Sequence, residues 1–123
     1  QLTFSQEIKM DGAIIVSTPQ EVALLDVKRG IKMFDKLGVK ILGLVDNMSY
    51  FTGDDGKKYK IFGEGGVKRT AEEFGKEFLG EIPLDPEVGK CGDEGKPIVE
   101  ANPDHEISKI YLELAKKIKS TYL

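Results

Sequence analysis

The segment that most constrains the fold is residues 11–49, where two apolar runs flank an amphipathic stretch. The first run, residues 13–16, reads AIIV without polar alternation, which is typical of a strand covered on both faces of a parallel sheet. The second run occupies residues 39–45. Between them, apolar residues recur at helical spacing and a leucine–glycine pair supplies the stop: Ala23, Val27, Ile31, Phe34 and then Leu37-Gly38. This order predicts a βαβ unit with a right-handed crossover.

The start of this helix is predicted at residues 18–21, TPQE. We expect Thr18 to cap the helix and Pro19 to take its first position, because the N–H that proline lacks would be unpaired there. Glu21 would close a capping box with Thr18. The helix is therefore expected to begin directly after the first strand.

Polar residues follow both strands, at the edge of the sheet where their carboxyl ends should lie. Ligands of open α/β sheets bind at that edge. Residues 18–20 and 47–49 are therefore the first places to look for a binding site. Each also has a purely structural interpretation, since Thr18 can serve only as a helix cap and Asn47 as a turn residue with a local side-chain bond. The residues alone leave these alternatives open.

The middle of the chain predicts a surface hairpin and a third strand. Two β-prone runs around a Gly/Asp cluster indicate a hairpin or flap over residues 50–62. The GEGG stretch at residues 63–66 has the composition of a phosphate cradle, but no buried strand precedes it, no Gly-Lys-Ser/Thr ends it, and Glu64 would repel an anion. We interpret it as a turn before a helix over residues 67–75. A strand is predicted at residues 78–82, ended by the proline that follows.

The last third is predicted to hold two helices and a loop. Asp85 is expected to cap a short helix that starts with a proline, and the glycine-rich residues 89–97 to form a loop. That loop carries Cys91, and a lone cysteine is more often incidental than catalytic. A cap-and-proline start at residues 102–104 predicts a final helix, in which His105 is interpreted as a surface residue rather than a base. The apolar stripe of this helix consists of Ile107, Ile110, Tyr111, Leu114 and Ile118.

Composition limits the class of protein. A chain of 123 residues is one domain or part of one. Its 18 basic and 21 acidic residues are interleaved and give a net charge of −3, so no nucleic-acid or membrane partner is expected. No apolar run reaches the roughly 20 residues that span a bilayer, and no signal-peptide pattern is present, so the cytoplasm is the expected location. A single cysteine excludes an internal disulfide and any metal site built from cysteines of one chain.

The chain opens on Gln1, and the βαβ unit begins soon after it. Because α/β sheets of this kind usually carry more strands, we expect a fragment of a longer protein, with residues 1–123 forming a single partial domain. A helical turn or two is expected within residues 2–8. A half-sheet would expose an edge and an apolar face, so we expect it to self-associate or to keep the missing half bound.

A set of motifs extends in order over essentially the whole chain: IIVSTPQEVALLDVKRGIKMF, LGLVDNMSYF, IFGEGG, FLGEIPLDPEV and GKPIV. Together they resemble the C-terminal half of the Mrp-type nucleotide-binding proteins, the ATP-binding iron–sulfur cluster carriers within the MinD-like group of P-loop ATPases. The resemblance implies a parallel sheet flanked by helices, the second half of a P-loop NTPase fold. It also implies a homodimer that holds ATP or ADP, with Mg²⁺, near the dimer face.

The resemblance further implies roles for individual residues. Asn47 would hydrogen-bond the adenine base, which suits an amide that presents both a donor and an acceptor to one base edge. Gln20 and Glu21 would lie at the start of a helix that faces the active site and the partner subunit. The wall on the other side of the base would consist of Pro83, Leu84 and Asp85.

Two departures from the family pattern limit what this chain does alone. The family's phosphate-binding loop and its metal-binding aspartates have no counterpart here, so the phosphate and Mg²⁺ ligands are expected outside this chain, which alone is not predicted to hydrolyse ATP. No catalytic or metal-binding residue is therefore assigned. Many members also carry a Cys-x-x-Cys after the NMS motif, whereas residues 50–59 contain no cysteine, which excludes a thiolate-bound iron–sulfur cluster there.

The leading hypothesis is the C-terminal part of an ATP-binding Mrp-type protein that assembles or carries iron–sulfur clusters for client proteins. A second hypothesis is a nucleotide-dependent adaptor that docks a partner through the flap at residues 50–62. A third is an α/β binding module, flavodoxin-like, with no nucleotide role. The sequence leaves all three open.

Overall fold

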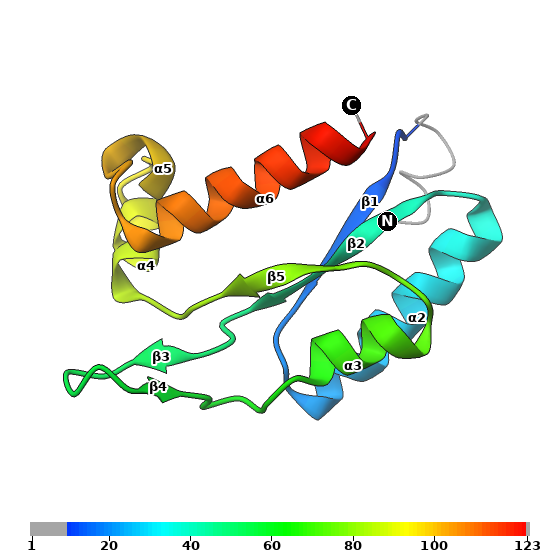
Figure 1. The fold of residues 1–123 in the computed structure, drawn as a ribbon, viewed down its shortest axis with the longest axis horizontal. Coiled ribbons are helices and arrows are strands. Elements are labelled where there is room, and N and C mark those ends of the chain that lie inside the picture. The colour runs from blue at the N-terminus through cyan, green and yellow to red at the C-terminus, as the bar shows by residue number, and fades with distance from the viewer. Residues whose placement is uncertain (1–9, 123) are drawn as a thin grey trace.

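The computed structural model describes residues 10–122, and the helical turn predicted within residues 2–8 lies outside them. A parallel sheet with the strand order β1-β2-β5 forms the centre of the structure (Figure 1). Its strands are β1 (Ala13–Ser17), β2 (Ile41–Asn47) and β5 (Phe78–Ile82). The predicted α/β class with a parallel sheet is confirmed, as are the first and third strands.

Helices cover the two faces of the sheet. On one face lie α2 (Glu21–Leu37) and α3 (Gly66–Glu73), and on the other lie α4 (Pro86–Asp93), α5 (Ile98–Ala101) and α6 (Glu106–Tyr122) (Figure 1). Strand β1 leads through α2 into its parallel neighbour β2, so the predicted βαβ unit is present. Within residues 10–122, no helix is both long and apolar enough to cross a membrane.

Each face of the sheet has its own apolar core. Ile31, Leu44 and Val67, all fully buried, centre the core under α2 and α3. The core under α4, α5 and α6 includes Val45 and Ile107. Because side chains alternate along a strand, β2 sends Leu44 into one core and Val45 into the other. Burial on both faces therefore fixes the register of the central strand.

The predicted hairpin is confirmed between β2 and α3. Its antiparallel strands are β3 (Phe51–Thr52) and β4 (Lys58–Tyr59). The turn between them is closed by the Gly56 N–H, which donates to the Gly53 carbonyl at 3.0 Å. The hairpin extends beyond the carboxyl end of β2 (Figure 1).

The start of α2 differs from the prediction. The helix begins at Glu21, with Gln20 rather than Thr18 at the N-cap position and no side-chain cap. Thr18 donates to the side-chain oxygen of Gln20 at 3.2 Å instead. Pro19 is buried and packs closely against Gly63. A Cβ added to Gly63 would lie only 2.8 Å from the Pro19 carbonyl oxygen. The packing of this proline delays the helix and overrides the local capping signal.

The loop predicted at residues 89–97 is wrong, because α4 remains helical as far as Asp93. Cys91 is 3% exposed and packs in the second core with Ile98 and Ile107. Glycines weaken a helix through their conformational entropy. Burial of the Cys91 face outweighs that local weakness.

The observed starts of β2 and α6 differ from the predicted starts by a few residues. Strand β2 begins at Ile41 rather than at residue 39, because the Val39 N–H still donates to the carbonyl of Phe34 in α2, at 2.9 Å. Helix α6 begins at Glu106 rather than at residues 102–104, because α5 and the turn after it occupy that stretch. In both cases the end of one element uses residues that the sequence pattern assigns to the next.

Strand β1 is not covered on both faces as predicted. Ile14 and Val16 are 38% and 57% exposed, and β1 pairs only with β2 among the described residues. These two side chains border a cavity of about 290 Å³ between the sheet and α6. The exposed edge and apolar face expected of a half-sheet are therefore present, and the self-association expected from them stays a prediction.

Replacing Ile31 with alanine should lower the free energy of unfolding by about 2–5 kcal/mol, because its fully buried side chain would leave a cavity in the core under α2. Val22, on the same helix and 73% exposed, is the control, and Val22→Ala should change that free energy by less than about 0.5 kcal/mol. Denaturant unfolding followed by circular dichroism measures both. Equal losses at the two positions would contradict the orientation of α2.

Candidate functional site

A cavity of about 310 Å³ opens at the carboxyl edge of the sheet, where β2 and β5 end and α4 and α6 pass. Its lining residues are Asn47, Met48, Ile82, Pro83, Leu84, Asp85, Pro86, Val88, Gly89 and Tyr111. The structure thus brings Asn47 and the predicted base wall at residues 83–85 together around one cavity. We call it the carboxyl-edge cavity.

Asn47 is the last residue of β2, and it also borders the apolar cavity between the sheet and α6. Ile82 and Tyr111 line both cavities as well. The amide of Asn47 therefore lies among mostly apolar neighbours. In such a setting one donor–acceptor group can orient a flat ligand by hydrogen bonding while apolar side chains contact its faces.

Backbone hydrogen bonds join the two walls of the carboxyl-edge cavity. The Ser49 N–H donates to the Ile82 carbonyl at 3.0 Å, and the Leu84 N–H donates to the Tyr50 carbonyl at 2.7 Å. Between Asn47 and Ser49, Met48 has a φ of 54°, in the left-handed region that residues with a Cβ rarely adopt. The turn after β2 is therefore fixed to the segment after β5 in an unusual conformation.

A polar cluster lies beside this turn. Asp46 is 2% exposed, and its Oδ1 has no hydrogen-bond partner among the described residues. The Ser49 hydroxyl donates to Glu81 Oε2 at 2.6 Å. Lys60 Nζ lies 3.9 Å from the same Glu81 oxygen. Because a hydroxyl has one proton, Ser49 cannot donate to both carboxylates.

Burial, followed by the nearby Glu81 carboxylate, raises the pKa of Asp46 from 3.8 to about 6, while Ser49 and Lys60 act in the opposite direction. Protonation of Asp46 removes a buried negative charge. The resulting O–H can donate to the Ser49 oxygen, whose own proton is used in the bond to Glu81. The cluster is therefore suited to hold a proton. Among residues 10–122, no group of three or more His, Cys, Asp or Glu side chains is arranged to hold a metal ion.

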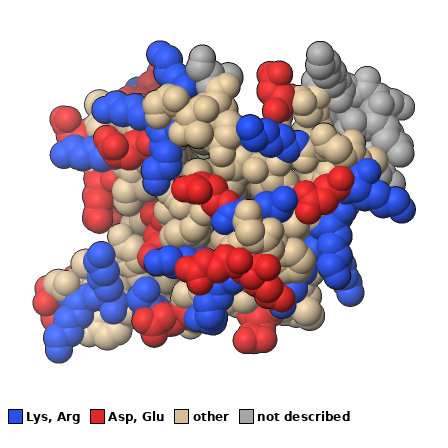
Figure 2. Space-filling view, turned by 45° about the vertical axis from the view of Figure 1, so that its right-hand side comes forward, with Lys and Arg blue, Asp and Glu red and all other residues tan. Residues whose placement is uncertain are grey.

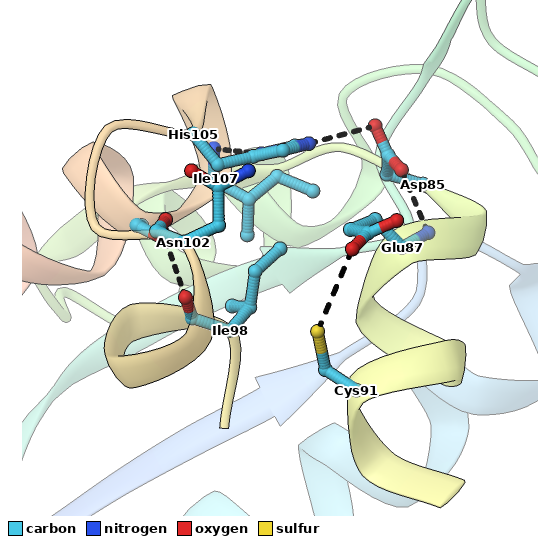
Figure 3. A network of polar contacts seen from close by, with 8 residues as sticks. Asp85, Glu87, Cys91, Ile98, Asn102, His105 and Ile107 are labelled. Atoms are coloured by element: carbon cyan, nitrogen blue, oxygen red, sulfur yellow. Dashed lines mark hydrogen bonds and ion pairs between the residues drawn. The ribbon is translucent and has the colours of Figure 1, made fainter. Parts of the chain in front are cut away.

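A second polar network fixes the wall residue Asp85 (Figure 3). Its Oδ1 accepts from the Glu87 N–H at 2.9 Å, which confirms the predicted cap of α4. Its Oδ2 lies 3.6 Å from His105 Nε2, and His105 Nδ1 accepts from the Ile107 N–H at 3.1 Å. The prediction of His105 as a surface residue holds only in part, because its side chain is 20% exposed and lies between the starts of α4 and α6.

The same network contains the cysteine. Cys91 Sγ donates to Glu87 Oε1 at 3.8 Å (Figure 3). Burial raises the pKa of the Cys91 thiol, the carboxylates of Glu87 and Glu94 raise it further, and Lys90 only partly offsets them. Because the thiolate is the reactive form, this environment disfavours a nucleophilic role.

The other sequence-predicted sites lie apart from the carboxyl-edge cavity. Gln20 and Glu21 are exposed at the start of α2 and do not line it, so their predicted role toward the active site or a partner subunit stays a prediction. Gly63 and Gly65 have φ angles of 130° and 69°, and Gly65 occupies the N-cap position of α3. This backbone geometry requires glycine and supports the interpretation of residues 63–66 as a structural turn.

Lysine and arginine side chains alternate with aspartate and glutamate over the face seen in Figure 2. The interleaving inferred from composition therefore holds on that face of the described residues. A larger groove of about 690 Å³ runs between β5 and α6, with lysines and glutamates among its lining residues. It lacks Asn47 and the residues of the base wall.

Sequence reasoning singled out residues 47–49, which include Met48, but it did not assign five other residues to the cavity lining: Ile82, Pro86, Val88, Gly89 and Tyr111. Tyr111 carried a signal, because it belongs to the predicted apolar stripe of the last helix. The left-handed conformation of Met48 has no local sequence signal, since glycine and asparagine are the residues that usually adopt it. The Ser49–Glu81 hydrogen bond joins residues 32 positions apart and depends on the strand register.

Comparison with known proteins agrees with these features. The sequence model described as NUBPL iron-transfer P-loop NTPase matches residues 1–119. The iron-sulfur cluster carrier protein of Aquifex aeolicus is 45% identical over 117 residues, covering 94% of this chain and 32% of that protein. The iron-sulfur protein required for NADH dehydrogenase of Arabidopsis thaliana, a mitochondrial protein, is 48% identical over 119 residues, covering 96% and 38%. This chain thus spans about a third of the length of these relatives.

Solved structures give the same fold. The nucleotide-binding protein from Archaeoglobus fulgidus in complex with ADP has a TM-score of 0.70 and 39% identity, covering 84% of this chain and 42% of that one. The cell division ATPase MinD of Pyrococcus furiosus, at a TM-score of 0.68 and 24% identity over 89% and 43%, supports the fold alone. The fold is that of the MinD-like P-loop NTPases. The chain belongs to the NUBPL iron-transfer P-loop NTPase family, and the resemblance to Mrp-type carriers is confirmed.

Asp46→Asn should stabilise the protein at neutral pH. A raised pKa means that the folded state binds the proton more tightly, so the contribution of Asp46 to stability is present below about pH 4 and is lost as the pH rises to about 6. Above that pH the variant should be more stable than the parent by about 1–3 kcal/mol, and the two should converge in acid. Asp54→Asn, at an exposed position, is the control and should follow the parent at every pH. A difference that does not vary with pH would contradict a buried proton at Asp46.

Proposed function

We propose that this chain supplies the adenine-recognition part of an ATP-binding protein that carries iron–sulfur clusters. The observation that carries the proposal is the convergence of Asn47 with residues 83–85 on one cavity at the carboxyl edge of a parallel sheet. That edge is where open α/β sheets bind ligands. The ADP complex of the A. fulgidus relative and the names of the curated relatives support the same conclusion.

Each cavity residue has a specific task in this proposal. The Asn47 amide donates to N7 and accepts from the N6 amino group of adenine, an edge at which guanine presents two acceptors and cannot form both bonds. Pro83 and Leu84 contact the face of the base. Asp85 is held by its cap to α4, and His105 Nε2 lies 3.6 Å from its other oxygen, so it orients the wall rather than moving with the ligand.

Phosphate chemistry is proposed to depend on residues outside this chain. P-loop NTPases hold phosphates with a glycine–lysine loop and Mg²⁺, and the 123 residues contain no such loop. Asp85, whose carboxylate lies in the cavity lining, already accepts a hydrogen bond from the start of α4 and lies close to His105. We therefore propose that residues 1–123 are the C-terminal part of a nucleotide-binding domain and that ATP hydrolysis, dimerisation and a cytoplasmic location belong to the whole protein.

The iron–sulfur cluster is the cargo in this account. The hairpin residues 50–59 carry no cysteine, so we propose that any cluster is bound by ligands elsewhere in the protein. One observation favours the second candidate, a nucleotide-dependent adaptor, because Tyr59 and Ile61 expose 46% and 58% of their surface on the hairpin segment. Such side chains suit a protein partner.

Asn47→Ala should weaken ADP binding by about tenfold or more and reduce the preference for ADP over GDP, because the hydrogen bonds to the base are lost. Titration calorimetry on the full native chain measures both nucleotides. Asn102→Ala is the matched control, since Asn102 is exposed and lies outside the cavity. Unchanged ADP affinity in Asn47→Ala would contradict base recognition at this site.

The carrier and adaptor proposals differ in iron content. If the protein carries clusters, the full chain purified without oxygen should contain iron and acid-labile sulfide in a fixed ratio to protein and should transfer them to an apo-ferredoxin. An adaptor should contain neither. In the adaptor case, Ile61→Lys should abolish capture of a partner while ADP affinity is unchanged.

A further inference from the structure

The turn that carries Asn47 needs external support to keep its conformation. Met48 is left-handed at φ 54°, and the residue is 39% exposed, so its own packing only partly compensates for the unfavourable backbone. A left-handed residue with a Cβ persists only where its surroundings hold it. The contacts that follow Met48 in the chain therefore help the strand register to set the direction of the Asn47 side chain.

Ser49 provides those contacts. It is 2% exposed, and its N–H donates to the Ile82 carbonyl at 3.0 Å. Its hydroxyl donates to Glu81 Oε2 at 2.6 Å, the short distance expected when the acceptor is charged. Glu81 lies on β5 opposite Asp46, so this bond ties the turn after β2 to the neighbouring strand. Lys60, at 3.9 Å and partly exposed, is a weaker companion of the same carboxylate.

We propose that Ser49 and Glu81 are positioning residues for Asn47, and that their hydrogen bond holds the left-handed turn that directs the Asn47 amide into the carboxyl-edge cavity. This inference rests on the proposed role of Asn47 in reading the adenine base. Neither Ser49 nor Glu81 lines the cavity, so both act through the turn and not by touching the nucleotide.

The first test is a double-mutant cycle on the full native chain, with the affinities for ADP and GDP as the readout. Ser49→Ala and Glu81→Ala should each weaken ADP binding by about tenfold and reduce the preference for ADP over GDP. The double variant should lose no more than either single variant, because both remove the same bond. Glu81→Gln keeps an acceptor for the Ser49 hydroxyl and should retain most of the affinity and preference. Glu73→Ala, at an exposed glutamate on α3, is the control.

A second test separates positioning from general loss of structure. Asparagine adopts the left-handed conformation more readily than methionine. In the Ser49→Ala background, Met48→Asn should therefore restore part of the preference for ADP over GDP. A merely destabilised protein would lose active fraction without changing the ratio of the two affinities, and Met48→Asn would not recover that ratio.

The outcomes distinguish this inference from the proposed function. If the parent does not prefer ADP, or if Asn47→Ala changes nothing, base recognition at this site is wrong and the positioning role is overturned with it. If Asn47→Ala behaves as expected while Ser49→Ala and Glu81→Ala keep both affinity and preference, only the positioning role is overturned. Additive losses in the double variant would also overturn it, because the two residues would then act separately.

Discussion

The parallel register of the three strands is the constraint on which the rest of the structure depends. It places Ser17, Asp46 and Glu81 at matching positions where the strands end. Side chains alternate along β2, so Asn47 points to the opposite face from Asp46. A slip of one residue would send the amide into the polar cluster and the carboxylate toward the carboxyl-edge cavity. Burial of Leu44 and Val45 in two separate cores prevents that slip.

Two local features that lower the stability of the fold lie at the carboxyl edge of the sheet. Asp46 is buried with one oxygen unpartnered among the described residues, and Met48 is held in a left-handed conformation one residue beyond Asn47. If stability alone mattered, asparagine would serve better than Asp46, and glycine or asparagine would serve better than Met48. Buried polar groups and backbone strain of this kind concentrate at binding sites. Their position on either side of Asn47 supports a functional origin.

The sequence predicted what depends on local pattern and missed what depends on tertiary packing. Apolar spacing identified the first and third strands and the inner face of α2, and the aspartate–proline start signature identified the Asp85 cap. The helical turns through Gly89 and Gly92 were missed because the burial of Cys91, which the local sequence does not reveal, outweighs two helix-weakening glycines. The delayed start of α2 was missed because Pro19 packs against Gly63, 44 positions away. The family resemblance selected Asn47 and residues 83–85, and only the structure places them around one cavity.

The central claim is that the adenine base binds between Asn47 and residues 83–85. The most direct measurement is an NMR titration of the full native chain with ADP, observing the side-chain amide of Asn47 and the backbone amides of Leu84 and Asp85. These resonances should shift together as ADP is added, and the resonance of the exposed Asn102 side-chain amide should not move. Saturable ADP binding that leaves the Asn47, Leu84 and Asp85 resonances unshifted would contradict it.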